Sequence, residues 1–342
     1  MEKTQAIFLC DRPETVWRVY DAATLQKLRE QLVLPETVYR KADLPGSEAA
    51  LAQVEYVFST WGMPELTDEE IAQYFPSLKA VFYGAGTVQA FARPFLQRGI
   101  RVFSAWGANA VPVAEYTVAQ IILAGKGFFQ GIRIQEEGTG DPLAARKAAR
   151  AYNDTFPCNY NVKVGILGVG MIGSLVCRLL QAYEMDVLVF DPFASDEKLA
   201  ELGATRADLD TVFAECQTVS CHIANLPATV GMLKYEHFSR MKPNGTFINT
   251  GRGAQVVEAD LIRALREEPN RTALLDVTYP EPPEPDSPFW TMPNVLLTPH
   301  IAGSMNNEVA RMGAYMEAEF RDVLAGKPCR YEITEKMLET MA

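Results

Sequence analysis

The sequence predicts an α/β protein of two domains, each built on a doubly wound parallel sheet with helices on its faces. Its 342 residues exceed what one ordinary hydrophobic core occupies, so two domains are expected. Short apolar runs alternate with helical patterns along most of the chain, which is typical of parallel strands joined by crossover helices. A glycine-rich turn, "ILGVGMIG", then opens a second and stronger series of the same kind.

The first series predicts one domain. Apolar runs that end in polar or glycine-containing turns predict strands over 5–10, 55–60, 78–86 and 100–107. Helical patterns between these runs cover 24–32, 67–75 and 88–99. Thr67 is a candidate N-cap, and Glu70 three residues later would complete a capping box.

The middle of the chain predicts one helix followed by a less regular segment. In "NAVPVAEYTVAQIILAGK", Pro112 suits the first helical turn and Gly125 would end the helix. Residues 126–160 combine glycine, charge and weak periodicity. They predict a partly helical excursion before the next domain core begins.

The second series predicts the other domain. Its strands are expected over 162–170, 186–192, 218–224, 245–253, 272–280 and 294–300, and its helices over 173–183, 195–203, 233–241 and 258–268. A last helix, 306–327, has an apolar face of Val309, Met312, Met316 and Phe320. Because the second domain is complete before it, this helix should pack on the first. We therefore assign 1–106 and 306–342 to one domain and 107–305 to the other.

Composition excludes several classes of partner. A net charge of −11 without a basic stripe argues against nucleic-acid binding. No apolar stretch is long enough to span a bilayer, and the N-terminus has no signal-peptide pattern, so a cytoplasmic protein without a membrane partner is expected. The six cysteines are scattered without a CxxC pair, which favours small buried hydrophobes over metal ligands, so no metal site is expected.

The glycine-rich turn predicts a dinucleotide site. Gly168 permits the tight turn, Gly170 lets the backbone approach a pyrophosphate, and Gly173 lets helix and strand pack closely. Met171 and Ile172 lead into the following helix, whose N-terminus would present amide donors to the phosphates. The next strand ends in Asp191, which would bind the adenosine ribose and repel a 2′-phosphate. No arginine follows Asp191 directly, so NAD is favoured over NADP. An ordinary tight turn is the alternative.

Three polar residues follow later strands of this domain: Arg252, Asp276 and His300, with Glu281 five residues after Asp276. Ligands of doubly wound sheets bind beyond the carboxyl ends of the strands. An arginine offers a planar charged fork for a carboxylate. A histidine can deliver a proton near neutral pH, and a carboxylate beside it would support its charged form. A surface arginine and a loop-capping histidine are the alternatives for each residue alone.

The sequence resembles the D-isomer-specific 2-hydroxyacid dehydrogenase family. The matching motifs are "VGILGVGMIG", "CHIANLPATVGML", "MKPNGTFINTGRGAQVVEADLIRAL", "LLDVTYPEPP" and "VLLTPHIAG", with weaker matches at "AWGANAVPVAEYT" and "YGAG". The resemblance implies a Rossmann NAD-binding domain, a flavodoxin-like substrate domain and a homodimer formed around residues 112–122. The run "TVQAFARP" after "GAG" and the segment before the glycine turn depart from the family pattern.

The resemblance also implies roles for single residues. Arg252 would bind the substrate's carboxylate and carbonyl oxygens, His300 would be the acid/base, and Glu281 would be the partner of His300. The cofactor would contact His222, Thr250, Gly251 and Asp276, and the backbone around Ala85 and Gly86 would hold the substrate carboxylate. Trp61 and Trp106 are candidates for the wall of the substrate pocket, with core or interface positions as alternatives.

The sequence therefore predicts an NAD-dependent D-2-hydroxyacid dehydrogenase that acts on a small 2-oxo acid. Formate dehydrogenases share the architecture, but their pattern has glutamine where Glu281 stands. The alternative from another class is an NAD-sensing binding or corepressor protein on the same fold. Such a protein could keep the glycine turn and even the Arg252, Glu281 and His300 group.

Overall fold

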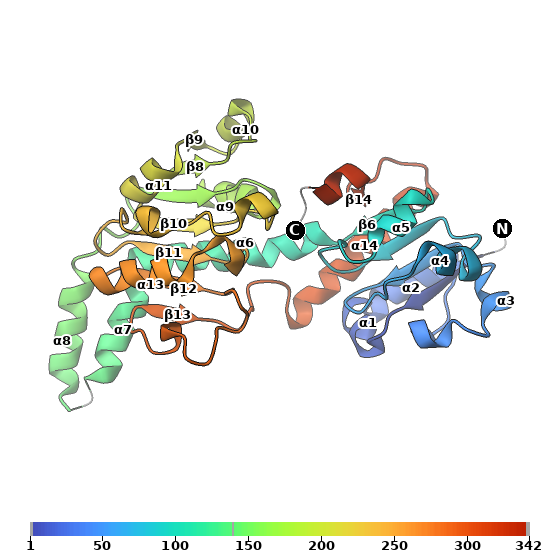
Figure 1. Ribbon diagram of the computed structural model, residues 1–342, viewed down its shortest axis with the longest axis horizontal. Helices are drawn as coiled ribbons and strands as arrows, with labels where there is room; N and C mark the ends of the chain where they lie inside the picture. The colour runs from blue at the N-terminus through green and yellow to red at the C-terminus, as the bar shows by residue number, and fades with distance from the viewer. Residues whose placement is uncertain (1–2, 139, 340–342) are drawn as a thin grey trace. The chain divides into compact units, whose positions relative to one another are not determined.

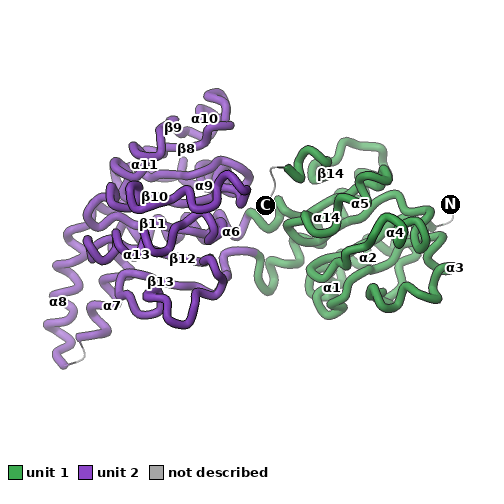
Figure 2. The backbone as a smooth tube through the Cα atoms, in the orientation of Figure 1, with its two compact units in different colours: residues 1–110, 304–342 green, residues 111–303 purple. Residues whose placement is uncertain are grey.

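The computed structural model describes residues 3–138 and 140–339, and the chain in it divides into two compact units (Figures 1 and 2). Unit 1 comprises residues 1–110 and 304–342, and unit 2 comprises residues 111–303. The sequence placed the two boundaries at 106/107 and 305/306. Residues 1–2, 139 and 340–342, which the expected ranges include, lie outside the described residues.

Unit 1 contains a mostly parallel sheet in the order β14-β6-β5-β4-β1-β2, with β3 also paired to β1. Only β14 runs antiparallel, against β6, among the strand pairs of the described residues. The strands are β1 (Thr4–Leu9), β2 (Leu32–Val33), β3 (Val38–Tyr39), β4 (Tyr56–Ser59), β5 (Ala80–Tyr83), β6 (Arg101–Ser104) and β14 (Glu332–Ile333).

Helices cover both faces of the unit 1 sheet. Those on one face are α3 (Glu48–Leu51), α4 (Asp68–Tyr74) and α5 (Ala92–Gln97). Those on the other are α1 (Pro13–Val19), α2 (Ala22–Gln31) and α14 (Val309–Leu324). Strand residues alternate between the faces, as pleated strands require. The capping box expected at Thr67 and Glu70 is confirmed at the start of α4.

An aromatic row forms the centre of the second of these cores. The rings of Phe58 and Phe82 stack with centroids 5.1 Å apart, and those of Phe82 and Phe103 stack at 4.8 Å. Phe320 of α14 meets Phe82 edge-on at 5.6 Å. The predicted apolar face of the last helix is therefore confirmed, and it packs on unit 1 as expected.

Unit 2 contains a fully parallel sheet in the order β13-β12-β11-β10-β7-β8-β9. The order reverses between β7 and β10, the switch point of a doubly wound fold. The strands are β7 (Val162–Leu167), β8 (Met185–Phe190), β9 (Ala204–Arg206), β10 (Thr218–Cys221), β11 (Thr246–Asn249), β12 (Thr272–Leu275) and β13 (Val295–Leu297). These two sheets confirm the predicted fold class.

Two sets of helices cover the faces of the unit 2 sheet. Those on one face are α11 (Leu209–Glu215), α12 (Tyr235–Phe238) and α13 (Glu258–Glu267). Those on the other are α6 (Trp106–Gly125), α9 (Met171–Leu180) and α10 (Asp196–Glu201). None of the helices in the described ranges is both long and apolar enough to cross a membrane.

The predicted start of the middle helix is wrong. Helix α6 begins at Trp106, so Pro112 lies inside it, although the helix does end at Gly125 as expected. A proline in that position removes one backbone donor, a loss that the packing of α6 overcomes here. Its residues Ala114, Val118 and Ile121 are buried in the unit 2 core.

The segment after α6 is more regular than the sequence indicated. It forms a helical hairpin of α7 (Phe128–Glu137) and α8 (Pro142–Asn153), which lie side by side (Figure 1). Asp141 caps α8 by accepting hydrogen bonds from the Leu143 and Ala144 amides at 3.1 and 3.0 Å. The predicted partly helical excursion is thus confirmed, but more of it is helical than the sequence indicated.

Candidate active site

The carboxyl ends of six strands of unit 2 lie in register. Hydrogen-bond pairing aligns Phe190, Leu167, Cys221, Asn249, Leu275 and Leu297 across β8, β7, β10, β11, β12 and β13. The residues that follow this row are Asp191, Gly168, His222, Thr250, Asp276 and Thr298. Nearly every side chain that the sequence selected therefore stands at, or within a few residues of, one edge of one sheet.

The glycine-rich turn has the geometry that a dinucleotide requires. Gly168 has φ +86°, a left-handed conformation that suits glycine. A Cβ at Gly173 would lie 2.0 Å from the Gly168 carbonyl oxygen, so only glycine lets the helix and the strand approach this closely. A Cβ at Gly170 would meet nothing within 4 Å, which leaves open space beside the turn. Met171 and Ile172 begin α9, whose first amides have no acceptor within the helix.

Asp191 ties the end of β8 to this turn. Its Oδ2 accepts a hydrogen bond from the Val169 amide at 2.8 Å. Its Oδ1 accepts from the amides of Phe193 and Ala194 at 2.8 and 3.1 Å. A carboxylate has about four lone-pair positions, so one remains for a ribose hydroxyl. The side chain is half-buried.

His222 and Thr250 follow the two central strands beyond the switch point. The Nε2 of His222 lies 3.0 Å from the Ser220 hydroxyl, while its buried Nδ1 has no partner in the described part of the chain. Burial lowers the pKa of His222 from 6.5 to about 3, so the ring is neutral. The Thr250 hydroxyl lies 3.1 Å from that of Thr117 on α6. His222 is therefore not a candidate proton donor near neutral pH.

Arg252 carries a guanidinium without an acidic partner. Its Nη1 donates to the Gly251 carbonyl at 2.8 Å, and no carboxylate of the described residues lies within ion-pair distance. Asn249 fixes the loop, because its Nδ2 donates to the Arg252 carbonyl at 2.9 Å and its Oδ1 accepts from the Gly251 amide at 3.0 Å. A Cβ at Gly253 would lie 1.9 Å from the Thr278 carbonyl carbon, so the loop fits tightly.

Asp276 is occupied by the segment that carries His300. Its Oδ1 accepts from the Thr298 hydroxyl at 2.6 Å and from the Ile301 amide at 2.8 Å. Its Oδ2 accepts from the Ala302 amide at 2.9 Å, and the residue is only 2% exposed. The contacts make Asp276 a fixed support of the 298–302 segment. The expected contact with nicotinamide stays a prediction.

His300 and Glu281 form a close pair. The imidazole Nδ1 lies 2.6 Å from Glu281 Oε1, and about half of each side chain is exposed. The Nε2 of His300 has no hydrogen-bond partner within the described ranges. His300 also has φ +53°, which is uncommon for a residue other than glycine. Such backbone strain concentrates at functional sites, where the surroundings hold a side chain in a required direction.

The other two predicted substrate contacts stand in unit 1. Ala85 and Gly86 follow β5, and their carbonyl oxygens accept hydrogen bonds from the Ser104 hydroxyl at 3.0 and 2.5 Å. Ala85 is buried, whereas a Cβ at Gly86 would meet nothing within 4 Å. Trp61 follows β4 and is 36% exposed, and the Trp106 ring packs edge-on against Tyr331 at 5.9 Å.

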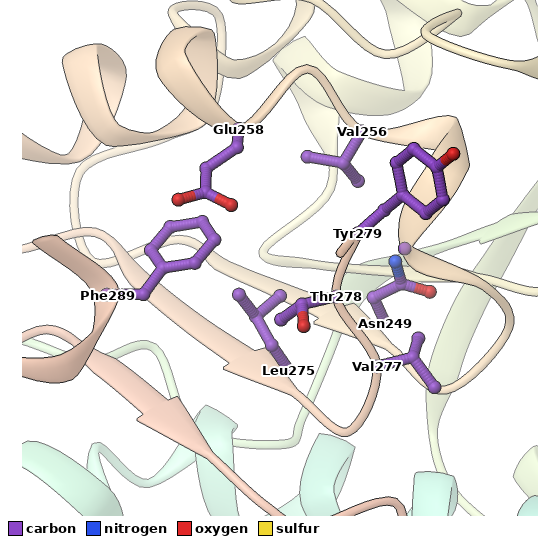
Figure 3. Close-up of a pocket in the computed structure, with 9 residues that line it drawn as sticks. Asn249, Val256, Glu258, Leu275, Val277, Thr278, Tyr279 and Phe289 are labelled. Atoms are coloured by element: carbon purple, nitrogen blue, oxygen red, sulfur yellow. The ribbon is translucent and has the colours of Figure 1, made fainter. Parts of the chain in front are cut away.

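A small, partly open cavity of about 10 Å³ lies beside the Arg252 loop. Glu258 and Phe289 line one side of it, and Asn249 and Tyr279 line the other (Figure 3). This volume is about that of one water molecule, so the cavity cannot hold a substrate. Among the described residues, no group of three or more histidine, cysteine, aspartate or glutamate side chains could hold a metal ion.

Sequence reasoning missed the residues that support the site. Asn249 and Ser220 act through contacts with residues two or three positions away, and Thr298 acts by donating to Asp276, 22 residues away. Tyr116 of α6 donates to the Thr298 hydroxyl at 3.2 Å from far away in the sequence. The first three stand beside the predicted residues in "INTGRG", "SCH" and "TPH", so their position could have indicated them. Nothing in the sequence around Tyr116 could.

Comparison with known proteins identifies relatives of both the sequence and the fold. Residues 131–302 match the family model described as "D-isomer specific 2-hydroxyacid dehydrogenase, NAD binding domain", which agrees with the predicted cofactor, NAD. The chain is 30% identical to the D-3-phosphoglycerate dehydrogenase of Archaeoglobus fulgidus over 280 residues, 80% of this chain and 50% of that protein. It is 30% identical to the glyoxylate reductase of Korarchaeum cryptofilum over 256 residues, 74% of each chain. It thus spans about half the length of the Archaeoglobus protein.

Solved structures share the fold. A phosphoglycerate oxidoreductase from Rhizobium etli superposes with a TM-score of 0.81 at 20% identity, covering 98% of this chain and 100% of that one. The D-mandelate dehydrogenase of Rhodotorula graminis superposes with a TM-score of 0.78 at 20% identity, covering 98% of each chain. At these identities the likeness shows the architecture alone.

Proposed function

The chain belongs to the D-isomer specific 2-hydroxyacid dehydrogenase family, and we propose on that premise that it is an NAD-dependent dehydrogenase that interconverts a 2-oxo acid and its D-2-hydroxy acid. The observation that carries the proposal is the His300–Glu281 pair at a strand end of the same sheet edge as the unpaired Arg252 guanidinium. A general acid and a carboxylate receptor are what the reduction of a 2-oxo acid needs.

Arg252 orients the substrate in this proposal. Its planar fork can donate two parallel hydrogen bonds to the carboxylate and the carbonyl oxygen of a 2-oxo acid. The Asn249 contacts hold the loop in place before the substrate arrives. In unit 1, the backbone around Ala85 and Gly86 is proposed to receive the same carboxylate.

His300 moves the proton. Its Nδ1 faces Glu281, which fixes the ring and leaves Nε2 to give a proton to the carbonyl oxygen of the substrate. In the reverse direction Nε2 accepts the hydroxyl proton. Bound NADH would supply the hydride to the carbonyl carbon.

The cofactor is proposed to lie along the strand ends of unit 2. Gly170 leaves room for its pyrophosphate, while Gly168 makes the tight turn and Gly173 lets the helix and the strand approach closely. The amides of Met171 and Ile172 would bind the pyrophosphate. The remaining proposed contacts are Asp191 for the adenosine ribose and His222, Thr250, Gly251 and Asp276 near the nicotinamide half. The Nδ1 of His222 has no hydrogen-bond partner among the described residues, and this supports the placement, because a bound group could supply the missing partner.

Partners other than the small 2-oxo acid follow the expectations from sequence. We propose a homodimer formed by α6 and its surroundings, since the adjoining α7–α8 hairpin exposes Phe128, Ile132 and Leu143. We place the protein in the cytoplasm, in keeping with six free cysteines, four of them buried. No nucleic-acid or membrane partner is proposed.

The test is a reaction of the purified chain with NADH and a panel of 2-oxo acids, including glyoxylate and 3-phosphohydroxypyruvate. We expect NADH oxidation with at least one acid. His300→Ala should lower kcat by roughly 10²–10⁴-fold while NADH binding survives. NADH binding without turnover across the panel would favour the NAD-sensing or corepressor alternative, which the names of the relatives do not favour.

A further inference from the structure

An open pocket of about 510 Å³ lies beyond the ends of β8 and β9 in unit 2. Asp191, Pro192, Arg206, Asp208 and Thr211 are among its lining residues. If Asp191 binds the adenosine ribose, as the proposed function holds, the adenosine half of the cofactor lies in this pocket. Arg206 is the cation among its described lining residues. The sequence favoured NAD because no arginine follows Asp191 directly, yet the fold brings Arg206 to the same loop.

The Arg206 guanidinium is held on that loop by four hydrogen bonds. Its Nε and Nη2 both donate to Asp196 Oδ1, at 2.9 and 2.8 Å. Its Nη1 donates to the Asp191 carbonyl at 2.8 Å, and its Nη2 also donates to the Ala194 carbonyl at 2.5 Å. The Nε–Nη2 edge is one that a phosphate can take in a bidentate contact, and Asp196 occupies it.

The other nearby cation is engaged as well. The ammonium of Lys198 donates to the Val169 carbonyl in the glycine-rich turn at 2.6 Å. The Asp196 side chain is 83% exposed and that of Arg206 is 41% exposed. An ion pair this open contributes little to stability, about 0–1 kcal/mol. What matters about the Asp196–Arg206 pair is the position in which it holds the positive charge of Arg206.

We infer that the Asp196–Arg206 pair determines the preference of this site for NAD over NADP. Asp196 holds the guanidinium against the loop backbone, so that a 2′-phosphate finds no free arginine in the pocket. Asp191 then presents its carboxylate to that position, which suits a 2′-hydroxyl and repels a phosphate. Without Asp196, Arg206 becomes a free phosphate ligand, as arginine is in NADP sites.

The test is the dissociation constant of NADH and of NADPH, each measured by titrating the nicotinamide fluorescence on the unmodified chain and its variants. Asp196→Ala should tighten NADPH binding about tenfold relative to NADH, since a charged hydrogen bond to phosphate contributes about 1.5–3 kcal/mol. The double variant Asp196→Ala with Arg206→Gln should lose this gain. That reversal distinguishes a freed arginine from a merely loosened loop.

Asp210→Ala is the matched control, because Asp210 also pairs with an arginine on the surface of unit 2, Arg240 at 3.2 Å, and does not line the pocket. It changes the net charge equally and should leave the NADPH to NADH ratio unchanged. An equal gain in Asp210→Ala, or no gain in Asp196→Ala while NADH still binds, would overturn the inference alone. Failure of the unmodified chain to bind NADH would overturn the proposed function with it.

Discussion

The carboxyl edges of the two sheets use polar side chains in different ways. In unit 1, the hydroxyls of Ser59, Thr60 and Ser104 donate to the backbone carbonyls of Leu9, at the end of β1, and of Gly84 and Ala85, in the loop after β5. In unit 2, the edge carries the charged residues Arg252 and Asp276 and the His300–Glu281 pair. The polar side chains at the unit 1 edge bind the backbone, whereas the unit 2 edge carries charged side chains and a His–Glu pair.

This difference teaches that similar sheets can divide the work of one protein. The edge of unit 2 contains the groups that we propose for proton transfer and for holding a carboxylate. The edge of unit 1 offers mainly backbone and open space, as at Gly86. Changes at unit 2 should therefore act on cofactor binding and turnover, and changes at unit 1 on stability and substrate choice.

The largest effect should follow from removing the guanidinium of unit 2. Arg252→Ala would lose the two charged hydrogen bonds proposed between the guanidinium and the substrate, of about 1.5–3 kcal/mol each. Steady-state kinetics should show kcat/KM reduced by roughly 10²–10⁴-fold, with NADH binding unchanged. Arg240→Ala, on the surface of the same unit, is the control. If Arg252→Ala had the same kinetic constants as the unmodified chain, the proposal that the unit 2 edge carries the chemistry would be wrong.

Paired glycine substitutions compare the two edges directly. Gly173→Val drives a side chain into the Gly168 carbonyl, and at about 3 kcal/mol of overpacking it should weaken NADH binding about hundredfold. Gly86→Ala meets nothing within 4 Å, so it should fold normally and alter only the KM for the 2-oxo acid. NADH titrations and KM measurements check both. If both variants lost NADH binding equally, cofactor binding would not be confined to the edge of unit 2.

The neutral His222 gives unit 2 a dependence on acid. Its pKa of about 3 in the folded state lies below its ordinary value of 6.5, so between these pH values the unfolded chain binds a proton that the folded chain does not. Stability should fall as the pH drops through this window, by at most about 2 kcal/mol at pH 5, since part of the residue reaches the surface. Urea unfolding of the wild type and His222→Gln at pH 7 and pH 5 should show a smaller loss in the variant. If both proteins lost the same stability between pH 7 and pH 5, His222 would not be the source of the pH dependence.

The smallest effect should come from a hydroxyl of unit 1. Thr60→Val removes the donor to the Gly84 carbonyl, 2.9 Å away, and leaves that carbonyl without this partner. Stability should decrease by about 1 kcal/mol in urea unfolding, with kcat little changed. Thr291→Val, an exposed hydroxyl with a long 3.4 Å contact, is the matched control. A kcat defect like that of Arg252→Ala would place chemistry in unit 1.

Much of the fold and of the unit 2 edge was predictable because it depends on local pattern. Buried strands appear in the sequence as apolar runs, and the glycine turn has its three glycines within six residues, 168–173. The segments that follow strands were found by the rule that parallel strands end at a common edge. The same rule predicts from the sequence that Arg252, Asp276 and His300 lie at one edge of the sheet.

What could not be predicted depends on contacts distant in sequence. The edge strands β9 and β14 span three and two residues, too few for a pattern. Pro112 lies inside α6 because tertiary burial outweighs local propensity. The contact of Arg206 with the loop after Asp191 depends on β9 lying beside β8. Asp276 was expected to face the cofactor, and the donors that occupy it come from the next strand's loop.

The path of the chain between the units has a consequence for biosynthesis. Unit 2 is one continuous segment, whereas unit 1 needs both residues 1–110 and residues 304–342. On the ribosome the aromatic row of Phe58, Phe82 and Phe103 therefore emerges long before Phe320 of α14, which covers it. Unit 2 can complete its core first, while the nascent unit 1 keeps an apolar face open. Chaperones that protect such faces should meet this chain at its N-terminal sheet until translation reaches α14.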